Sequence, residues 1–261
     1  MTLNWIGLLG VGLSLVAFCV TYAVLRRRTT AVRLAFAGGF ALAALPAVLF
    51  AVYYLHVLPE TEWFYTLRAW RGSEGFVVFL GCAGGALMAL LPRSLLVFPL
   101  LAVLALGVAP YLKPILGPLP DSVFTETWAG DTCLQSTAST CAPASICTIL
   151  RSFGIDTSER ATTRAAFSSA GGTEAWYLAR FVQDHGLVAQ FRFADTFTPE
   201  LGLPALVGVR FGRVGHFIAV LKVDGDDVTY ADPLAGRARV SLAQFRKRYS
   251  FTGFHLVISK P

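Results

Sequence analysis

The sequence predicts two parts: an N-terminal bundle of four transmembrane helices, and an α+β domain whose helices precede an antiparallel sheet. Hydrophobic residues make up 55% of the chain and charged residues only 15%, which is unusual for a soluble protein. The apolar excess is concentrated in residues 1–112, whereas residues 121–261 carry the scattered charge of a globular domain. Long uncharged runs occur in the first part, and short β-rich runs occur in the second.

Four apolar segments predict the transmembrane domain, residues 1–112, because a spanning helix needs ~20 apolar residues. The segments are residues 5–25, 34–55, 76–91 and 95–112. The third segment is short, with 16 residues. Gly81 and Gly85 in the third segment, and Ala35 and Gly39 in the second, have a spacing that lets helices approach closely in lipid. Glycine is also simply common in membrane helices, so both interpretations of this spacing stay open.

Loop charges predict the orientation of these helices. The basic residues of the first and third loops are Arg26, Arg27, Arg28, Arg33 and Arg93. The second loop, residues 56–75, mixes basic and acidic side chains. Because basic loops stay in the cytoplasm, both termini and the second half of the chain are expected outside the cytoplasm. The first segment is expected to be retained, since arginines follow it and none precedes it.

Residues 113–121 predict a short, stiff linker, because they contain Pro114, Pro118 and Pro120. The α+β domain, residues 122–261, is therefore expected close to the bilayer surface. Its predicted helices are residues 141–153, 173–185 and 242–249, with Ser139, Thr140 and Thr173 as candidate capping residues. Its predicted strands are residues 188–193, 205–210, 216–223, 228–231 and 254–258. Asp224 and Gly225 have the composition of a hairpin turn between two of these strands.

The net charge of +6 does not indicate a nucleic-acid partner. Much of this charge comes from arginines that flank the apolar segments, where they set orientation. Arg246, Lys247 and Arg248 form the only dense basic run of the second half, with few aromatic residues among them. A solvated helix face explains this run better. The chain also lacks a Cys-x-x-Cys pair and the glycine-rich phosphate loop of ATPases, so we expect no metal, no cofactor and no ATP.

Cys141 is the candidate nucleophile, because it begins an apolar helix. The positive end of a helix dipole favours the thiolate, which is the reactive form of cysteine. A partner base is still needed, and the chain has only four histidines. His56 lies at the membrane edge, His185 ends a helix, and His255 is inside the last strand with no carboxylate after it.

His216 is the candidate base, because it opens a strand and Asp232 follows the next strand. Two antiparallel strands joined by a short hairpin bring the end of the second beside the start of the first. Asp232 is therefore expected next to His216, where a carboxylate fixes the imidazole tautomer and stabilises the imidazolium. The side-chain amide of Gln135, six residues before Cys141, is a candidate oxyanion donor.

These residues resemble the papain-like peptidases that process bacteriocin precursors after double-glycine leaders. The resemblance covers residues 133–258 and rests on the order and spacing of several short motifs. They are Gln135, Cys141-Ala142-Pro143-Ala144, a helix ending in Gly154, Gly215-His216-Phe217, Asp232-Pro233 and Phe251-Thr252-Gly253. It implies that Cys141 is the nucleophile, His216 the general base, Asp232 the orienting acid and Gln135 the oxyanion-hole donor. Ala142-Pro143 departs from the family, which usually has glycine directly after the cysteine.

The sequence thus predicts a stand-alone, membrane-anchored cysteine endopeptidase that cleaves a peptide or protein at the membrane through an acyl-thioester intermediate. The expected partners are the lipid bilayer and a peptide substrate, which could carry a leader. The expected location is a bacterial inner or cell membrane with the catalytic domain outside the cytoplasm. Two other classes stay open: a transpeptidase or amidase with the same triad, and a non-catalytic peptide-binding module of a secretion system. A disulfide between Cys133 and Cys147 also stays open.

Overall fold

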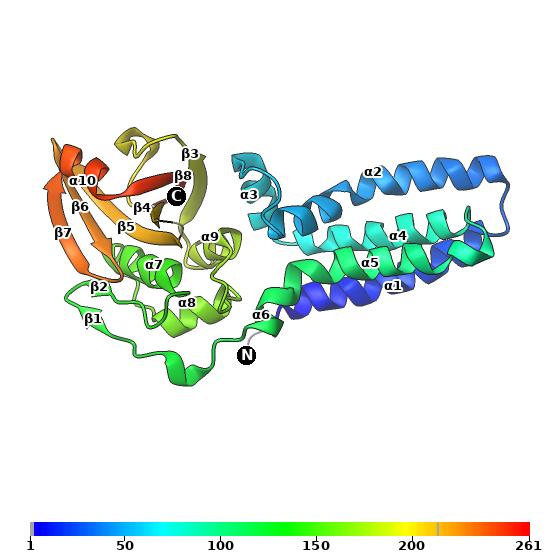
Figure 1. Cartoon of the computed structure of the whole chain (residues 1–261), viewed down its shortest axis with the longest axis horizontal. Coiled ribbons are helices and arrows are strands. Elements are labelled where there is room, and N and C mark those ends of the chain that lie inside the picture. The colour runs from blue at the N-terminus through cyan, green and yellow to red at the C-terminus, as the bar shows by residue number, and fades with distance from the viewer. Residues whose placement is uncertain (1–2, 213) are drawn as a thin grey trace. The chain divides into compact units, whose positions relative to one another are not determined.

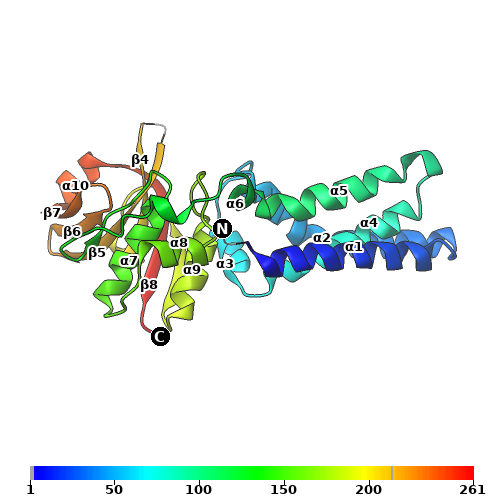
Figure 2. The same cartoon turned by 90° about the horizontal axis from the view of Figure 1, so that it is seen from below.

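The computed structural model describes residues 3–212 and 214–261, which form two compact units (Figures 1 and 2). The helical unit consists of residues 3–60 and 71–112. The sheet unit consists of Lys113–Pro261 together with Thr61–Trp70, which the sequence analysis had placed in a loop of the transmembrane domain. The order of helices first and antiparallel sheet afterwards is confirmed in the sheet unit.

The helical unit contains α1 (Trp5–Leu25), α2 (Thr30–Tyr54), α4 (Val77–Met88) and α5 (Val97–Val108). Asn4 caps α1, since its side-chain oxygen accepts a hydrogen bond from the Gly7 N–H at 2.9 Å. Among the described residues, three helices are long and apolar enough to cross a membrane: Trp5–Leu25, Thr30–Tyr54 and Val97–Leu116. The helix at Ser73–Met88 is apolar but shorter, so length and composition do not by themselves establish four spans.

Gly81 and Gly85 are where α4 packs most closely against α1. A Cβ atom at Gly81 would lie 1.9 Å from the Ser14 carbonyl oxygen, and one at Gly85 would lie 2.3 Å from the Phe18 carbonyl oxygen. Only glycine permits this approach, as expected for small residues four apart. Gly39 on α2 has nothing within 4 Å of the corresponding position, so the same spacing there has no packing role within the described residues.

One six-stranded antiparallel sheet forms the centre of the sheet unit (Figure 1). Its strands are β3 (Val188–Phe193), β4 (Ala205–Phe211), β5 (Val214–Asp224), β6 (Asp227–Asp232), β7 (Gly236–Ser241) and β8 (Ser250–Ser259), in the order β3-β8-β4-β5-β6-β7. A separate small hairpin pairs β1 (Trp128–Ala129) with β2 (Thr132–Cys133). The predicted strands are all present, and β7 and the small hairpin were not predicted.

The helices of the sheet unit are α7 (Cys141–Ser152), α8 (Glu159–Ala165), α9 (Ala175–Asp184) and α10 (Leu242–Arg248). α8 was not predicted, because it is short and polar. Thr173 does not cap α9 as predicted: Glu174 is the N-cap residue, and the Thr173 hydroxyl donates to Ser168 instead. Thr140 is the N-cap residue of α7, but its hydroxyl bonds within the preceding loop.

The β5–β6 hairpin determines which residues meet at the end of these two strands that is opposite the turn. Gly225 turns the chain with φ +60°, a left-handed conformation that suits glycine. Pairing runs from Asp224 opposite Asp227 to Ala219 opposite Ala231, with a shift between Val220 and Lys222. Asp232 therefore returns to the part of β5 that begins with His216, as the sequence predicts.

Helix α3 (Glu62–Ala69) lies between α2 and α4 in the chain but packs within the sheet unit. The ring of Tyr65 is surrounded by four aromatic rings at centroid distances of 5.1–5.8 Å. They belong to Trp176 on α9, Phe191 and Phe193 on β3, and Phe254 on β8. Phe64 also packs edge-on against Trp176, at 5.9 Å. An aromatic core therefore joins α3 to the domain that follows α5.

Polar contacts reinforce this aromatic core. Arg68 is 1% exposed and donates to the Tyr177 hydroxyl at 2.9 Å. The Arg180 guanidinium donates to the carbonyls of Arg68, Ala69 and Trp70, at 2.8, 3.1 and 3.0 Å. These carbonyls end α3 and have no partner inside the helix, so an arginine there satisfies them and complements the helix dipole.

Candidate active site

Cys141 is the first residue of α7 and is 7% exposed. Helix α7 is buried from Cys141 to Leu150 and packs against β5. One turn after Cys141, the Ser145 hydroxyl donates to the Phe217 carbonyl at 3.1 Å. Phe217 directly follows His216, so this hydrogen bond brings the start of α7 to the start of β5.

His216 and Asp232 form a buried pair. His216 Nε2 lies 2.9 Å from Asp232 Oδ1, and the two residues are 5% and 3% exposed. The same Oδ1 accepts the Leu234 N–H at 2.9 Å. Since Asp232 engages Nε2, Nδ1 is the ring nitrogen left for Cys141. The structure thus brings His216 and Asp232 together, as predicted from their positions around the hairpin.

The electrostatics of the pair favour its charged form. Burial lowers the pKa of His216, but hydrogen bonds with Asp232 and Cys141 and the charges of both partners outweigh burial and raise the pKa to about 9. Burial raises the pKa of Asp232, but the hydrogen bonds from His216, the Leu234 N–H and Tyr249 outweigh it and hold the pKa below its ordinary value. The pair can therefore hold an imidazolium against the Asp232 carboxylate.

Gln135 lies in the loop before α7. Its backbone N–H donates to the Pro233 carbonyl at 3.0 Å, which connects this loop to the residue after Asp232. Its side-chain Nε2 donates to the Thr137 carbonyl at 2.7 Å, and its Oε1 is buried without a partner among the described residues. An amide nitrogen carries two hydrogens, so one of them is not used by this hydrogen bond.

Glu159 on α8 fixes the residue after Gln135. It is fully buried, and its carboxylate accepts hydrogen bonds from the Ser136 N–H at 2.7 Å and from the Ser136 hydroxyl. Charge-assisted hydrogen bonds of this kind are stronger than neutral ones. Glu159 was not predicted, because a glutamate in the first turn of a short helix has the appearance of an ordinary surface residue.

Two aromatic residues next to the pair were also missed. The Tyr249 hydroxyl donates to Asp232 Oδ2 at 2.8 Å, and the ring of Phe211 lies 5.2 Å from that of His216. Tyr249 ends a predicted helix, and Phe211 directly follows a predicted strand, so each had the pattern of a core aromatic. No local sequence signal separates a tyrosine that bonds a buried carboxylate from one that only packs.

The other candidates do not join the pair. His185 Nδ1 contacts the Phe181 carbonyl at 2.8 Å within α9, and His255 is buried inside β8, where burial lowers its pKa. Cys133 and Cys147 are buried free thiols in one small cluster with Ala144. Burial, followed by the neighbouring Cys133, raises the pKa of Cys147 well above its ordinary value. Cys147 is therefore expected to be unreactive, whereas Cys141 lies at the start of a helix, where a thiolate is favoured.

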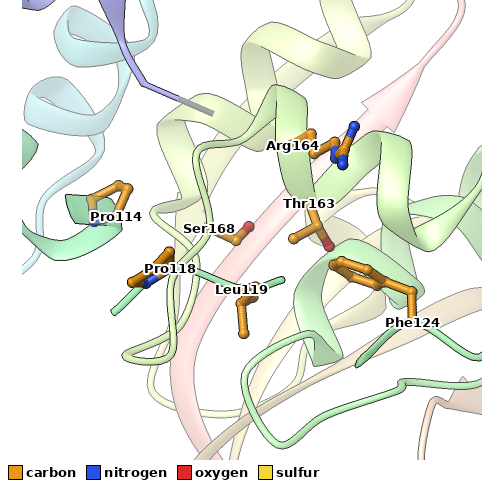
Figure 3. A pocket seen from close by; sticks show the side chains of 7 residues that line it. All are labelled: Pro114, Pro118, Leu119, Phe124, Thr163, Arg164 and Ser168. Carbon is orange, nitrogen blue, oxygen red and sulfur yellow. The ribbon is translucent and has the colours of Figure 1, made fainter. Parts of the chain in front are cut away.

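A small pocket lies between the linker and α8 (Figure 3). It is lined by Pro114, Pro118, Leu119, Phe124, Thr163, Arg164 and Ser168. None of Cys141, His216, Asp232 and Gln135 is among these residues, so the pocket is separate from the candidate active site.

The sequence profile of the Peptidase C39 family matches residues 131–261, half of the chain. An uncharacterised protein of Methanothermobacter marburgensis is 32% identical over 126 residues, which are 48% of this chain and 86% of that protein. The probable functional amyloid protease FapD of Pseudomonas aeruginosa is 25% identical over 132 residues, which are 47% of this chain and 58% of that protein.

Two solved structures are also similar. A double glycine motif protease from an AMS/PCAT transporter, in complex with the leader peptide, has a TM-score of 0.42 and 21% identity, covering 50% of this chain and 91% of that chain. The peptidase domain of Streptococcus ComA, a bi-functional ABC transporter, has a TM-score of 0.43 and 19% identity, covering 49% and 96%.

The hydrogen bond between His216 and Asp232 leads to a prediction about how His216 titrates. The raised pKa means that the His216 imidazolium is present at neutral pH and is lost as the pH rises through about 9. In Asp232→Asn the stabilising charge is absent, so the pKa of His216 should fall toward its ordinary 6.5. Imidazole NMR of histidine-labelled protein measures this directly, since the chain has four histidines.

The matched control is Asp227→Asn. Asp227 is also on β6, but its side chain is 46% exposed and pairs with Arg239. This change should leave the His216 titration where it is in the unaltered protein. An unchanged His216 titration in Asp232→Asn would contradict the electrostatic description of the pair.

Proposed function

Because the chain belongs to the Peptidase C39 family and is a cysteine peptidase, we propose that it is a membrane-anchored endopeptidase with Cys141, His216 and Asp232 as its triad. The observation that carries this proposal is the buried His216–Asp232 pair, whose imidazole lies against the start of the helix that bears Cys141. An imidazolium with a pKa of about 9 is well matched to a thiolate at neutral pH.

The proposed reaction begins with the Cys141 thiolate. Its sulfur attacks the carbonyl carbon of the scissile peptide bond, and the carbonyl oxygen becomes an oxyanion. The Gln135 amide donates a hydrogen bond to that oxyanion. As the C–N bond breaks, the His216 imidazolium gives its proton to the leaving amine, and an acyl-thioester on Cys141 remains.

The second half of the reaction reverses the role of His216. The neutral imidazole takes a proton from water, the hydroxide attacks the thioester carbonyl, and Cys141 leaves as the thiolate. Asp232 holds Nε2 through both halves, so Nδ1 keeps facing the reacting atoms. The products are a new carboxylate and a new amine, with His216 protonated again.

Exposed apolar side chains next to the pair support a peptide substrate with apolar residues near the cleaved bond. Phe211, 45% exposed, packs on His216, and Leu234, 59% exposed, is the residue whose N–H bonds Asp232. Such side chains lose water when they are covered, which stabilises binding. The likeness to a probable functional amyloid protease supports an extended protein segment as substrate.

The packing of α3 supports four membrane spans. α3 lies in the chain between α2 and α4, and the domain it packs into begins after α5. Both must then lie on one side of the membrane, which requires an even number of crossings between Trp70 and Lys113. Val97–Leu116 is long enough to provide one crossing, so the helix at Ser73–Met88 has to provide the other.

The short helix can meet this requirement. A helix rises 1.5 Å per residue, so Ser73–Met88 spans about 24 Å of a hydrocarbon core that is about 30 Å thick. Local thinning of the bilayer accommodates a mismatch of this size at modest cost. With the arginines of the first loop in the cytoplasm, we propose that both the second loop and the catalytic domain are extracytoplasmic.

Replacement of Cys141 tests the activity. We expect the full chain in detergent to cleave members of a proteome-derived peptide library, and Cys141→Ala to reduce cleavage by at least ~10³-fold, because no acyl-thioester can form. Cys147→Ala is the matched control, since Cys147 is a buried thiol on the same helix and should keep activity. Mass spectrometry identifies the products.

The products also separate the enzyme classes. Reaction in ¹⁸O-water should place ¹⁸O in the new carboxyl group if the thioester is hydrolysed. A ligated product in the presence of an added amine would instead indicate a transpeptidase. Cleavage at the original rate by Cys141→Ala would overturn the proposed nucleophile.

Accessibility tests the topology. We expect an impermeant thiol reagent to label Glu60→Cys and Lys260→Cys in intact cells, and Arg27→Cys only after lysis, with the labelled sites identified by mass spectrometry. Glu60 belongs to the second loop, Lys260 follows β8, and Arg27 lies in the first loop. Labelling of Glu60→Cys and Lys260→Cys from opposite sides would rule out an even number of crossings between them.

A further inference from the structure

We propose that Tyr249 is a positioning residue for catalysis, which holds the Asp232 carboxylate in the orientation that His216 requires. This inference rests on the proposed function of the triad and extends it by one residue. The Tyr249 hydroxyl donates to Asp232 Oδ2 at 2.8 Å, and Tyr249 and Asp232 are 4% and 3% exposed. Two buried hydrogen bonds therefore connect His216 to Asp232 and Asp232 to Tyr249.

The two carboxylate oxygens have different tasks. Oδ1 is shared between His216 Nε2 and the Leu234 N–H, both at 2.9 Å. Oδ2 accepts the Tyr249 hydroxyl. A carboxyl group turns about its bond to Cβ unless both oxygens are held, so a donor on Oδ2 fixes the plane in which Oδ1 meets His216. A buried carboxylate also needs such donors to remain charged.

Tyr249 is itself held firmly. It follows α10, whose start is fixed by the reciprocal hydrogen bonds of Ser241 and Gln244. Its ring contacts four aromatic rings at centroid distances of 5.6–6.4 Å, and the Arg248 guanidinium lies 5.7 Å from its centre. The four rings belong to Phe211, Tyr230, Phe245 and Phe251. Because the Tyr249 ring is held in one position, its hydroxyl can fix the orientation of the Asp232 carboxylate.

The hydroxyl also keeps its proton. Burial, the Asp232 carboxylate and the neighbouring Tyr230 raise the pKa of Tyr249 above its ordinary value. Tyr249 is therefore a hydrogen-bond donor to Asp232 throughout the pH range in which a thiolate–imidazolium pair exists. Its position in the sequence, 17 residues after Asp232 and beyond β7 and α10, makes this contact a property of the folded domain.

The test compares Tyr249→Phe with Tyr230→Phe in the full chain. Each change removes one buried hydroxyl oxygen from the same aromatic cluster. The Tyr230 hydroxyl is near that of Tyr249 but is not among the donors to Asp232, so its loss leaves Asp232 with all its donors. Both variants should keep the fold, which thermal unfolding checks, because phenylalanine fills nearly the same volume.

We expect Tyr249→Phe to lower kcat by roughly ten-fold with an unchanged KM, because the residue aims the triad and does not touch substrate. Loss of a donor raises the pKa of Asp232, so the acid limb of the rate profile should move to higher pH. In the imidazole spectrum, the His216 midpoint should fall below about 9, by less than in Asp232→Asn, because the carboxylate keeps its charge but is no longer held in its orientation. Tyr230→Phe should match the unaltered protein in its kinetic constants, its rate profile and its His216 midpoint.

Two results would overturn the proposal. One is a Tyr249→Phe enzyme with unaltered kcat, rate profile and His216 titration. The other is an equal loss in both variants that follows a lowered unfolding temperature, which would indicate a structural role only. The His216 titration needs no substrate, so it decides about Tyr249 even if no peptide is cleaved. Absence of cleavage by the unaltered chain would count against the proposed function alone.

Discussion

The buried carboxylate of Asp232 is the constraint on which the site depends. A charge removed from water must be compensated by hydrogen bonds and an opposite charge, and here the donors come from three places. His216 is on β5, the Leu234 N–H is in the next turn, and Tyr249 follows α10. The hairpin register, the β6–β7 turn and α10 must therefore all be correct before Asp232 can be held against His216. The fold of the domain and the state of the site thus both depend on the Asp232 carboxylate.

A second constraint comes from α3, which is separated from the catalytic domain in sequence and integrated with it in structure. Tyr65 inserts among four aromatic rings, and Arg180 caps the end of the helix. Since α3 precedes α4 and the domain follows α5, the packing of α3 restricts the membrane topology that we propose. The family match begins at residue 131, so α3 lies outside the matched region.

The His216–Asp232 pair and the bounds of α1 could be predicted from the sequence, because each depends on a short segment of the chain. The hairpin signal at Asp224-Gly225 and the strands around it were enough to place Asp232 beside His216. The long apolar runs gave α1 its bounds, since solvation in lipid selects for uninterrupted apolar length. Tyr249, Glu159 and α3 could not be predicted, because their roles come from tertiary contacts between segments far apart in the chain. A polar contact made only in the folded state leaves no periodic pattern.

The central claim is that Cys141 exists as a thiolate paired with the His216 imidazolium. The most direct measurement is the rate at which an impermeant alkylating reagent labels each cysteine of the intact chain at about pH 6, mapped by mass spectrometry. An ordinary thiol with a pKa of ~8.5 is barely ionised at that pH. We expect selective labelling of Cys141 that is lost in His216→Ala. Labelling of Cys141 no faster than that of the other cysteines, or unaffected by His216→Ala, would contradict it.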